Sequence, residues 1–389
     1  MRRSLICVFT GSRAEYGLLK PLLIAIRKHP HFRLKLVVSG AHLSSAFCYT
    51  YKQIKRDGFK IDEKVKMLLN SDTETGISKS LGLGIVSYAD TLDRIRPDLV
   101  ILLGDRFEAF AFATASHIHR IPIAHLHGGE TTEGAIDEAF RHAITKMSHL
   151  HFTSTDDYRK RVIQLGEEPR TVFNVGAIGL DNIRTMKLLT RSDFEKKTKF
   201  TLGEKNLIVT FHPVTLEKNS SMAQFKELLK FISIQKKTKI IFTKANADTN
   251  GRIINKMIDK FVKRYKYRAC SFASMGSKLY LSALQYVDAV VGNSSSGIIE
   301  APSFKIGTIN IGDRQNGRIK AKSIIDSSPV SRDINMAFKK LYSSRFQSVL
   351  KKIRNPYGNG HSTEMIINML EKNLDKIKIK KSFHDIIIK

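Results

Sequence analysis

The motif Gly292-Asn-Ser-Ser-Ser-Gly297 carries the strongest chemical signal in the chain, because a short apolar run leads directly into three hydroxyl groups and a glycine. We expect a helix to begin here, so that free N–H groups, hydroxyls and the helix dipole together suit a phosphate or diphosphate. Glu300 falls on the second helical turn, where a carboxylate can bind sugar hydroxyls, and Arg314 adds a guanidinium after the next strand. The predicted anion site comprises Ser294, Ser295, Glu300 and Arg314.

Two further motifs follow apolar runs in the first half of the chain. Gly11-Ser-Arg-Ala-Glu-Tyr-Gly17 indicates a tight turn into a helix, and Arg13 within that turn favours phosphate binding. The motif lacks the G-x-G-x-x-G spacing of a dinucleotide site, so it does not support NAD binding. In Gly104-Asp-Arg-Phe107, Asp105 is expected to face a ligand, and Arg106 to hold either that carboxylate or a phosphate. Alternatively, Asp105 only caps the next helix.

Histidines concentrate between His117 and His151, a stretch that holds seven of the thirteen in the chain. At its centre stands His125-Leu-His-Gly-Gly-Glu130. No H-E-x-x-H or comparable ligand spacing is present, so a metal site is not favoured. The glycine pair Gly128-Gly129 is expected to let the backbone approach a ligand closely.

Acid–base groups are expected after strands of both halves. Glu130 follows the histidine-rich run, Asp137 stands where the next helix begins, and His212 precedes Pro213, which ends a strand. Alternatively, Asp137 is a helix-start residue that complements the dipole and His212 a buried structural histidine. Together with Asp105, these side chains are predicted to serve in general acid–base catalysis.

Short apolar runs alternate with amphipathic stretches along almost the whole chain, and this pattern predicts the elements that position these residues. Continuous apolar strands separated by helices are typical of a parallel sheet covered on both faces. A polar, helix-like stretch at 181–199 separates two such series, which places a domain boundary near 180–200. Strands are expected at 5–10, 33–39, 99–103, 121–125, 150–153, 172–175, 207–211, 239–242, 288–291 and 308–311. Helices are expected at 17–28, 222–235, 251–265 and 294–303.

Composition narrows the class of protein. The chain has 389 residues, 42% hydrophobic and 26% charged, which is typical of a globular protein of two or three domains. Its net charge of +29 divides into +7 (27 basic, 20 acidic) for residues 1–190 and +22 (38 basic, 16 acidic) for the rest. We interpret this excess as a lysine-rich surface rather than a nucleic-acid or membrane site. Three scattered cysteines and no membrane-length apolar run favour the cytoplasm.

Taken in order, the motifs closely resemble those of bacterial hydrolysing UDP-N-acetylglucosamine 2-epimerases of sialic acid biosynthesis, over about residues 1–370. The resemblance implies an α/β, GT-B-like fold of two Rossmann-like, doubly wound parallel-sheet domains with UDP in the interdomain cleft. The domains are expected at 1–185, on the sugar and acid–base side, and 186–365, on the UDP side, with a helix and basic tail at 366–389. It also implies conversion of UDP-GlcNAc and water into N-acetylmannosamine and UDP without metal or cofactor, in a homo-oligomer (dimer or tetramer).

Carried over residue by residue, the resemblance implies that Ser294 and Ser295 hold the diphosphate and Glu300 the uridine ribose. The phosphate charge is balanced by Arg13, Arg106 and Arg314. Asp105, Asp137 and His212 match catalytic positions. Many relatives carry a carboxylate where this chain has His127, so either Glu130 or His127 takes the place of that third acid.

Three alternatives stay open at the level of the sequence. A hydrolysing 2-epimerase for UDP-N,N′-diacetylbacillosamine, from legionaminic acid biosynthesis, shares the motifs and differs only at C4 and C6 of the sugar. A GT-B glycosyltransferase shares the fold and the UDP site but transfers the sugar to an acceptor. A basic nucleic-acid-binding protein is the third, and it predicts steeply salt-dependent binding to any DNA.

Overall fold

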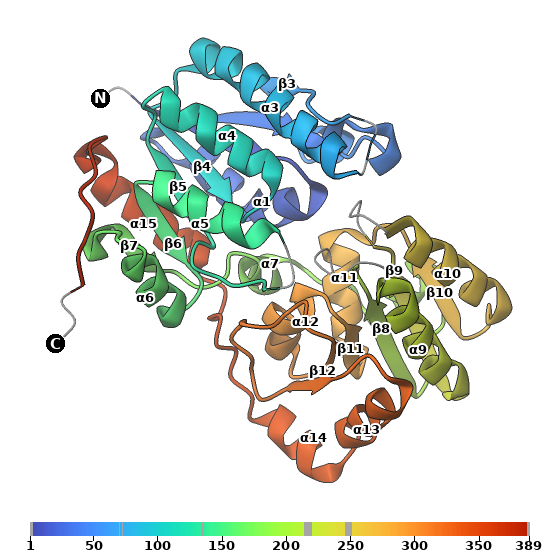
Figure 1. Cartoon of the computed structure of the whole chain (residues 1–389). Coiled ribbons are helices and arrows are strands. Elements are labelled where there is room, and N and C mark those ends of the chain that lie inside the picture. Colours follow the sequence, from blue (N-terminus) through green and yellow to red (C-terminus); the bar gives the residue numbers. More distant parts are fainter. Residues whose placement is uncertain are drawn as a thin grey trace. The chain divides into compact units, whose positions relative to one another are not determined.

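A computed structural model describes residues 3–69, 71, 73–133, 136–213, 220–245 and 251–386 (Figure 1). The chain divides into two compact units. The first contains Met1–Glu130, Asp137–Asn182 and Tyr357–Lys389, and the second contains Thr131–Ile136 and Ile183–Pro356. This division differs from the sequence expectation, because the chain from Tyr357 onward packs with the first unit rather than extending the second and ending in a separate tail.

The first unit is built on a parallel sheet, seven-stranded in the described residues, with strand order β3-β2-β1-β4-β5-β6-β7. Its strands are β1 (Ser4–Thr10), β2 (Phe32–Ser39), β3 (Glu63–Val65), β4 (Leu99–Leu103), β5 (Ile123–Leu126), β6 (Leu150–Thr153) and β7 (Val172–Asn174). Its helices are α1 (Arg13–Lys28), α2 (Tyr51–Arg56), α3 (Glu74–Ile95), α4 (Phe107–Ile118), α5 (Asp137–Met147), α6 (Asp156–Gln164) and α15 (Ser362–Asn373). The short helix α7 (Leu180–Thr185) contains the boundary between the units.

Both faces of this sheet are buried, and this explains the continuous apolar strands. Along β4, Leu99 and Ile101 join one hydrophobic core, whereas Val100 and Leu102 join another on the opposite face. Helices α1 and α15 contribute to the first core, and α3 and α4 contribute to the second. The arrangement is therefore the doubly wound sheet that the apolar pattern predicts.

The C-terminal helix α15 belongs to the first unit for two physical reasons. Its buried residues Ile366 and Leu370 join the core that α1 covers. At its start, the carboxylate of Asp181 accepts hydrogen bonds from the backbone N–H groups of Ser362 (2.9 Å) and Thr363 (2.6 Å). These contacts satisfy orphan donors of the first helical turn and fix the helix against the first unit.

The second unit has the strand order β10-β9-β8-β11-β12-β13, all parallel, which is the Rossmann order of a doubly wound sheet. Its strands are β8 (Lys205–Thr210), β9 (Thr238–Thr243), β10 (Ala269–Phe272), β11 (Ala289–Gly292), β12 (Gly307–Ile311) and β13 (Ile324–Ser327). Its helices are α8 (Arg191–Thr198), α9 (Ser220–Ile234), α10 (Gly251–Arg264), α11 (Gly276–Leu284), α12 (Ser295–Ile299), α13 (Ser331–Leu341) and α14 (Ser344–Lys351).

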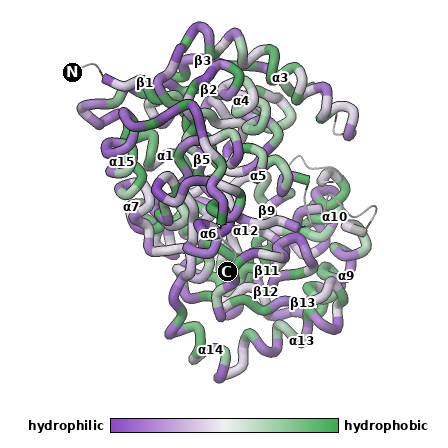
Figure 2. Tube along the Cα trace, turned by 60° about the vertical axis from the view of Figure 1, so that its left-hand side comes forward, coloured by the Kyte–Doolittle hydropathy of each residue, from purple (hydrophilic) through white to green (hydrophobic). Residues whose placement is uncertain are grey.

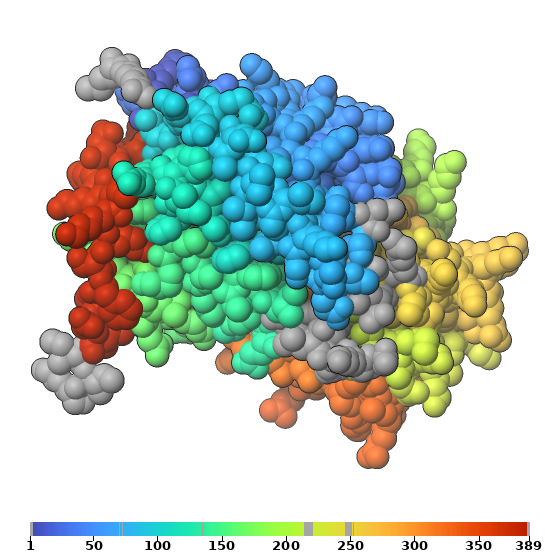
Figure 3. Space-filling view, turned by 45° about the horizontal axis from the view of Figure 1, so that its top comes forward, coloured from blue at the N-terminus to red at the C-terminus, as the bar shows by residue number. Residues whose placement is uncertain are grey.

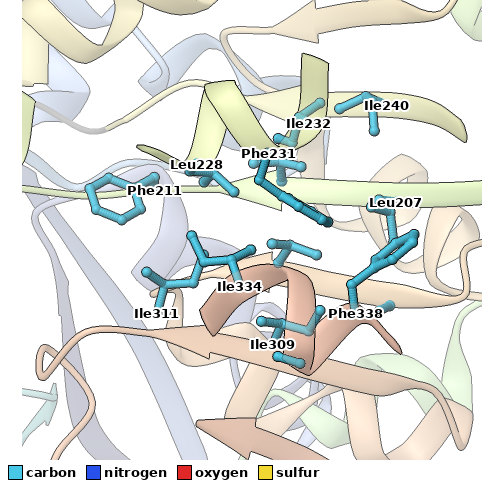
Figure 4. Close-up of a cluster of buried hydrophobic side chains, with 14 of the residues drawn as sticks. Leu207, Phe211, Leu228, Phe231, Ile232, Ile240, Ile309, Ile311, Ile334 and Phe338 are labelled. Atoms are coloured by element: carbon cyan, nitrogen blue, oxygen red, sulfur yellow. The ribbon is translucent and has the colours of Figure 1, made fainter. Parts of the chain in front are cut away.

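The larger core of the second unit lies between the sheet and helices α9 and α13 (Figure 4). Phe231 of α9 and Ile334 and Phe338 of α13 pack against Leu207 of β8 and Ile309 of β12. Ile208 of β8 points to the other face, into a second core with residues of α8 and α11. Figure 2 shows green and purple residues interspersed along helices such as α3 and α14, as expected of helices with one buried face.

Several expected boundaries are corrected by the structure. Helix α1 begins at Arg13, four residues before the expected start at Gly17, because the Ser12 hydroxyl caps it. The helix-like stretch at 181–199 is two helices, α7 and α8. The helix expected at 294–303 is the five-residue α12 followed by a 3₁₀ turn at Ala301–Phe304. The edge strands β3, β10 and β13 were not expected, because they are short and carry polar residues.

Within the described residues, no helix has both the length and the apolar character that crossing a bilayer requires.

Candidate functional site

The predicted site residues gather at the carboxyl ends of central strands in each sheet. Strand order reverses between β1 and β4 in the first unit and between β8 and β11 in the second. Ligands of open α/β sheets bind beyond such switch points, because the loops there diverge. Arg13, Asp105 and Arg106 follow β1 and β4, whereas His212, Ser294 and Ser295 follow β8 and β11.

Asp105 is held by a buried arginine to which the sequence analysis assigns no role. The side chain of Arg141, on α5, is 3% exposed, and its Nη2 pairs with Oδ2 of Asp105. Arg141 Nη1 also lies 3.6 Å from Glu138 Oε2 on the same helix. Asp105 is not the cap of α4, since Arg106 occupies the N-cap position and makes no side-chain cap there. The carboxylate is therefore oriented by an ion pair at the end of β4 and stays partly exposed.

Arg106 lies against two carboxylates rather than standing apart as a phosphate ligand. Its Nε is 3.1 Å from Glu108 Oε2 and 3.9 Å from Glu15 Oε1. Burial and the charge of Glu108 raise the pKa of Glu15 to about 7, although Arg106 and hydrogen bonds from Gly11 and Ser12 lower it. The positive charge of Arg106 thus balances at least one buried carboxylate within the first unit.

Arg13 opens helix α1 at the carboxyl end of β1. Ser12 is the N-cap, and its hydroxyl accepts from the backbone N–H of Glu15 (3.4 Å). Arg13 is half-buried, and burial lowers the pKa of its guanidinium. The turn thus places a partly desolvated cation at the switch point, as the glycine-rich motif predicts.

The turn after β5 is organised by His127 and Glu130. The backbone N–H of Ile178 donates to Nε2 of His127 (3.3 Å), so in the neutral ring the proton resides on Nδ1. Nδ1 then donates to Oε1 of Glu130 (2.7 Å), which also accepts from the Ser154 hydroxyl (2.7 Å). Both nitrogens of the ring are therefore engaged inside the protein, and Glu130 is buried.

Gly128 and Gly129 are tightly packed inside the first unit on the side where a Cβ would project. A Cβ on Gly128 would lie 2.9 Å from Thr145 Oγ1, and a Cβ on Gly129 would lie 2.5 Å from the carbonyl oxygen of Tyr158. Gly129 also has a φ of +76°. Any larger residue would displace the chain that carries His127 and Glu130.

Two other residues of the first unit, His125 and Asp137, differ in burial. His125 is fully buried and bridges the Gly104 carbonyl (2.7 Å) and the Thr145 hydroxyl (3.1 Å). Burial lowers its pKa to about 3, which keeps the ring neutral. Asp137 begins α5 and is half-buried, four residues before Arg141.

Among the described residues, no cluster of three or more His, Cys, Asp or Glu side chains has a metal-binding arrangement.

In the second unit, the hydroxyl-rich motif forms a short helix with a tyrosine beside it. Ser294 is the N-cap of α12 and accepts from the backbone N–H of Ser296 (3.3 Å). The Ser296 hydroxyl donates to the Tyr280 hydroxyl (2.7 Å). Burial raises the pKa of Glu300, and a hydrogen bond with Ser296 opposes that shift. Sequence reasoning missed Tyr280, which lies on α11, because a single tyrosine on an amphipathic helix gives no distinctive pattern.

Asn293 joins the remaining predicted residues of the second unit. Its amide bonds both backbone groups of His212, and its carbonyl oxygen accepts from Arg314 Nη1 (3.2 Å) and Gln315 Nε2 (2.9 Å). Gly292, just before it, has a φ of +129°, and a Cβ there would overlap the Thr210 carbonyl. The two units thus present different chemistry: carboxylates paired with arginines in the first, and a histidine, hydroxyls and an arginine in the second.

The chain is similar to known proteins over most of its length. A family model described as UDP-N-acetylglucosamine 2-epimerase matches residues 24–371. The chain is 42% identical over 347 residues to the GDP/UDP-N,N′-diacetylbacillosamine 2-epimerase (hydrolyzing) of Campylobacter jejuni, covering 89% of this chain and 90% of that protein. It is 41% identical over 390 residues to the polysialic acid biosynthesis protein P7 of Escherichia coli, covering 98% and 97%.

The crystal structure of UDP-GlcNAc 2-epimerase from Neisseria meningitidis bound to UDP-GlcNAc superposes with a TM-score of 0.82. The sequence identity is 17%, and the match covers 95% of this chain and 100% of that chain. This likeness confirms the expected GT-B-like fold, with its two doubly wound parallel sheets.

Proposed function

Because the chain belongs to the UDP-N-acetylglucosamine 2-epimerase family, we propose that it is a hydrolysing 2-epimerase that converts UDP-GlcNAc and water into N-acetylmannosamine and UDP. One observation carries this proposal. The switch point of the first unit presents Asp105 in an ion pair with Arg141, while that of the second joins His212, Ser294 and Arg314 through Asn293. Acid–base groups and an anion site are the two requirements of the reaction.

The first step is the loss of UDP. The C1–O bond breaks, its electron pair leaves with UDP, and the diphosphate charge is stabilised by the Ser294 and Ser295 hydroxyls and by Arg314. A carboxylate or imidazole removes the proton from C2, and the C–H electron pair forms the C1–C2 double bond of 2-acetamidoglucal. Glu300 holds the uridine ribose in this proposal.

The second step is the addition of water. Oxygen adds to C1 while a proton returns to C2 from the opposite face, so the sugar leaves with the manno configuration. Two faces of one ring require acid–base groups on both sides, and Asp105, Asp137, Glu130 and His212 are the proposed set. Arg13 and Arg106 remain the other proposed cations for balancing the phosphate charge, and Arg106 is already paired with Glu108 within the first unit.

A second candidate substrate is UDP-N,N′-diacetylbacillosamine, favoured by the 42% identity to the Campylobacter jejuni enzyme. Both sugars undergo the same chemistry at C1 and C2. The test is to incubate the purified protein with each UDP-sugar in heavy water and to follow the products by NMR. The proposed activity yields free N-acetylmannosamine with one deuteron at C2. Release of the corresponding 2-epimer from the diacetylated substrate alone identifies the second candidate, and absence of any free epimer refutes both.

UDP affinity is expected to depend on Arg314. Arg314→Ala should weaken UDP binding by about 1.5–3 kcal/mol, the range for hydrogen bonds to charged groups, and Ser294→Ala should do the same. Isothermal titration calorimetry with UDP measures this without turnover. Arg332→Ala, an exposed arginine on α13, is the matched control and should bind UDP as the wild type does. Unchanged affinity in both site variants contradicts the proposed anion site.

The third acid is expected to be Glu130 rather than His127. Both ring nitrogens of His127 are hydrogen-bonded inside the protein, so we assign the ring to positioning Glu130. Glu130→Gln should lower kcat by roughly 100-fold, the scale of a lost acid–base group, and His127→Asn by much less. Asparagine suits the φ of +65° at position 127. The reverse order in steady-state assays would assign the acid–base role to His127.

A further inference from the structure

Asn293 makes an unusually complete set of contacts for a residue outside the proposed chemistry. Its side chain is fully buried at the end of β11, next to β8 in the sheet (Figure 1). Its Oδ1 accepts from the backbone N–H of His212 (2.7 Å), and its Nδ2 donates to the backbone carbonyl of His212 (2.7 Å). The amide thus binds both main-chain groups of one residue that lies 81 positions earlier in the chain.

The backbone of Asn293 holds a different set of partners. Its N–H donates to the Thr210 carbonyl (3.1 Å), and its carbonyl oxygen accepts from Arg314 and Gln315. Removing the side chain therefore leaves the contacts to Arg314 and Gln315 in place. The contact with His212 depends on the amide, whereas the contact with the anion site depends on the main chain.

We propose that Asn293 is a positioning residue that fixes the backbone of His212 so that the imidazole meets the sugar. The proposal rests on the proposed function, in which His212 takes part in proton transfer. Pro213 follows His212 directly and has no N–H, so the chain cannot continue β8 there, and the Asn293 amide replaces the missing ladder contacts. A shift of His212 by even 1 Å costs rate, because proton transfer requires hydrogen-bond distance.

The same strand supplies a matched control. Asn206, at the amino end of β8, is 5% exposed, and its Oδ1 accepts from the Gly203 N–H (2.8 Å) while its Nδ2 donates to the Gly203 carbonyl (3.1 Å). This is the same two-bond amide contact at the opposite edge of the sheet. Asn293→Ala and Asn206→Ala therefore remove equivalent interactions, and both should lower the melting temperature.

Only Asn293→Ala is expected to change turnover. Its kcat should fall at least about 10-fold, while its affinity for UDP in calorimetry stays within about 3-fold of wild type, because the main-chain acceptor for Arg314 remains. Asn206→Ala should keep both values. The hydroxyl in Asn293→Ser can bond only one of the two His212 backbone groups, so its kcat should lie between those of Asn293→Ala and the wild type. This variant also keeps the test usable if Asn293→Ala fails to fold.

A double-mutant cycle with His212→Ala tests the route of the effect. If Asn293 acts through His212, then Asn293→Ala in the His212→Ala background should lower kcat by less than about 2-fold further. Three results would overturn the proposal. The first is that the two substitutions lower kcat by fully additive amounts, and the second is that Asn293→Ala and Asn206→Ala lower kcat equally. The third is that folded Asn293→Ala keeps the wild-type kcat. If the wild-type protein turns over neither UDP-sugar, the proposed function is refuted instead. Calorimetry with UDP then shows whether the anion site is still present.

Discussion

Asp105→Asn is expected to lower kcat by about 100-fold or more, the usual scale for removal of a general acid or base. Asparagine has the size of aspartate but cannot take up or release the proton at C2 of the sugar. The structure places Asp105 at the end of β4, oriented by the buried Arg141 and still partly exposed. Steady-state turnover of UDP-GlcNAc measures the effect, and UDP affinity should change comparatively little.

Stability must be separated from catalysis in this variant. Arg141 is buried and loses one counter-ion in Asp105→Asn, and although Glu138 remains 3.6 Å away, some loss of stability is expected. Turnover should therefore be measured at a temperature well below the melting transition, and circular dichroism should be used to check that the variant is folded. Asp93→Asn, an exposed aspartate of α3 with 70% side-chain exposure, is the control and should behave as wild type. A kcat close to that of wild type in folded Asp105→Asn removes Asp105 from the acid–base set.

Glu167→Gln is expected to lower the free energy of unfolding by about 1.5–3 kcal/mol, the range for hydrogen bonds to charged groups, because it removes a buried anion that faces a buried histidine, a partly buried lysine and an exposed lysine. Glu167 is 1% exposed. Its carboxylate contacts Nζ of Lys146 (2.6 Å), Nζ of Lys381 (2.6 Å) and Nε2 of His151 (3.0 Å). A neutral amide leaves two ammonium groups without their counter-charge and turns an N–H donor toward them.

The C-terminal segment, red in Figure 3, lies against other parts of the first unit, and this cluster is one of its contacts there. Lys381 donates to the backbone carbonyls of Lys146 and Ser148 as well as to Glu167. The backbone N–H of His384 donates to the Gly166 carbonyl (3.0 Å). Thermal unfolding should show a midpoint lower by on the order of 10 °C, and limited proteolysis should release the C-terminal segment earlier. Glu168→Gln, at the partly exposed neighbouring residue, should change neither measurement.

The stabilisation by Glu167 depends on pH in a stated direction. Burial alone would raise the pKa of Glu167, but hydrogen bonds and charges from His151, Lys146 and Lys381 lower it to about 2. A carboxyl whose folded-state pKa is depressed stabilises the protein above its unfolded pKa of about 4.5 and loses that contribution as the pH falls toward 2. Glu167→Gln should lack this loss, so the stability difference from wild type should narrow between about pH 4.5 and 2. A constant difference across that range contradicts the assignment.

Much of the fold is encoded in local patterns. The uninterrupted apolar run Leu99–Leu103 predicts a strand buried on both faces, and the structure shows alternate residues entering two cores. Glycine- and hydroxyl-rich segments after such runs, as at Gly292–Gly297, predict turns from a strand into a helix at the carboxyl edge of the sheet, and α12 begins there. These inferences succeed because periodicity and turn chemistry depend on neighbours in the sequence. The polar edge strands were not predicted for the same reason, because they are defined by pairing with a neighbouring strand and not by an apolar pattern.

The partners of each charged or polar side chain were decided only by tertiary structure. Arg106 pairs with Glu108, Asp105 pairs with Arg141, and Asn293 binds the backbone of His212. The last two contacts join residues 36 and 81 positions apart. The basic C-terminal run, which the sequence analysis places in a basic tail, brings Lys381 against a buried carboxylate. A residue type states which bonds a side chain can form, but long-range packing determines which groups lie within reach and which are shielded from water.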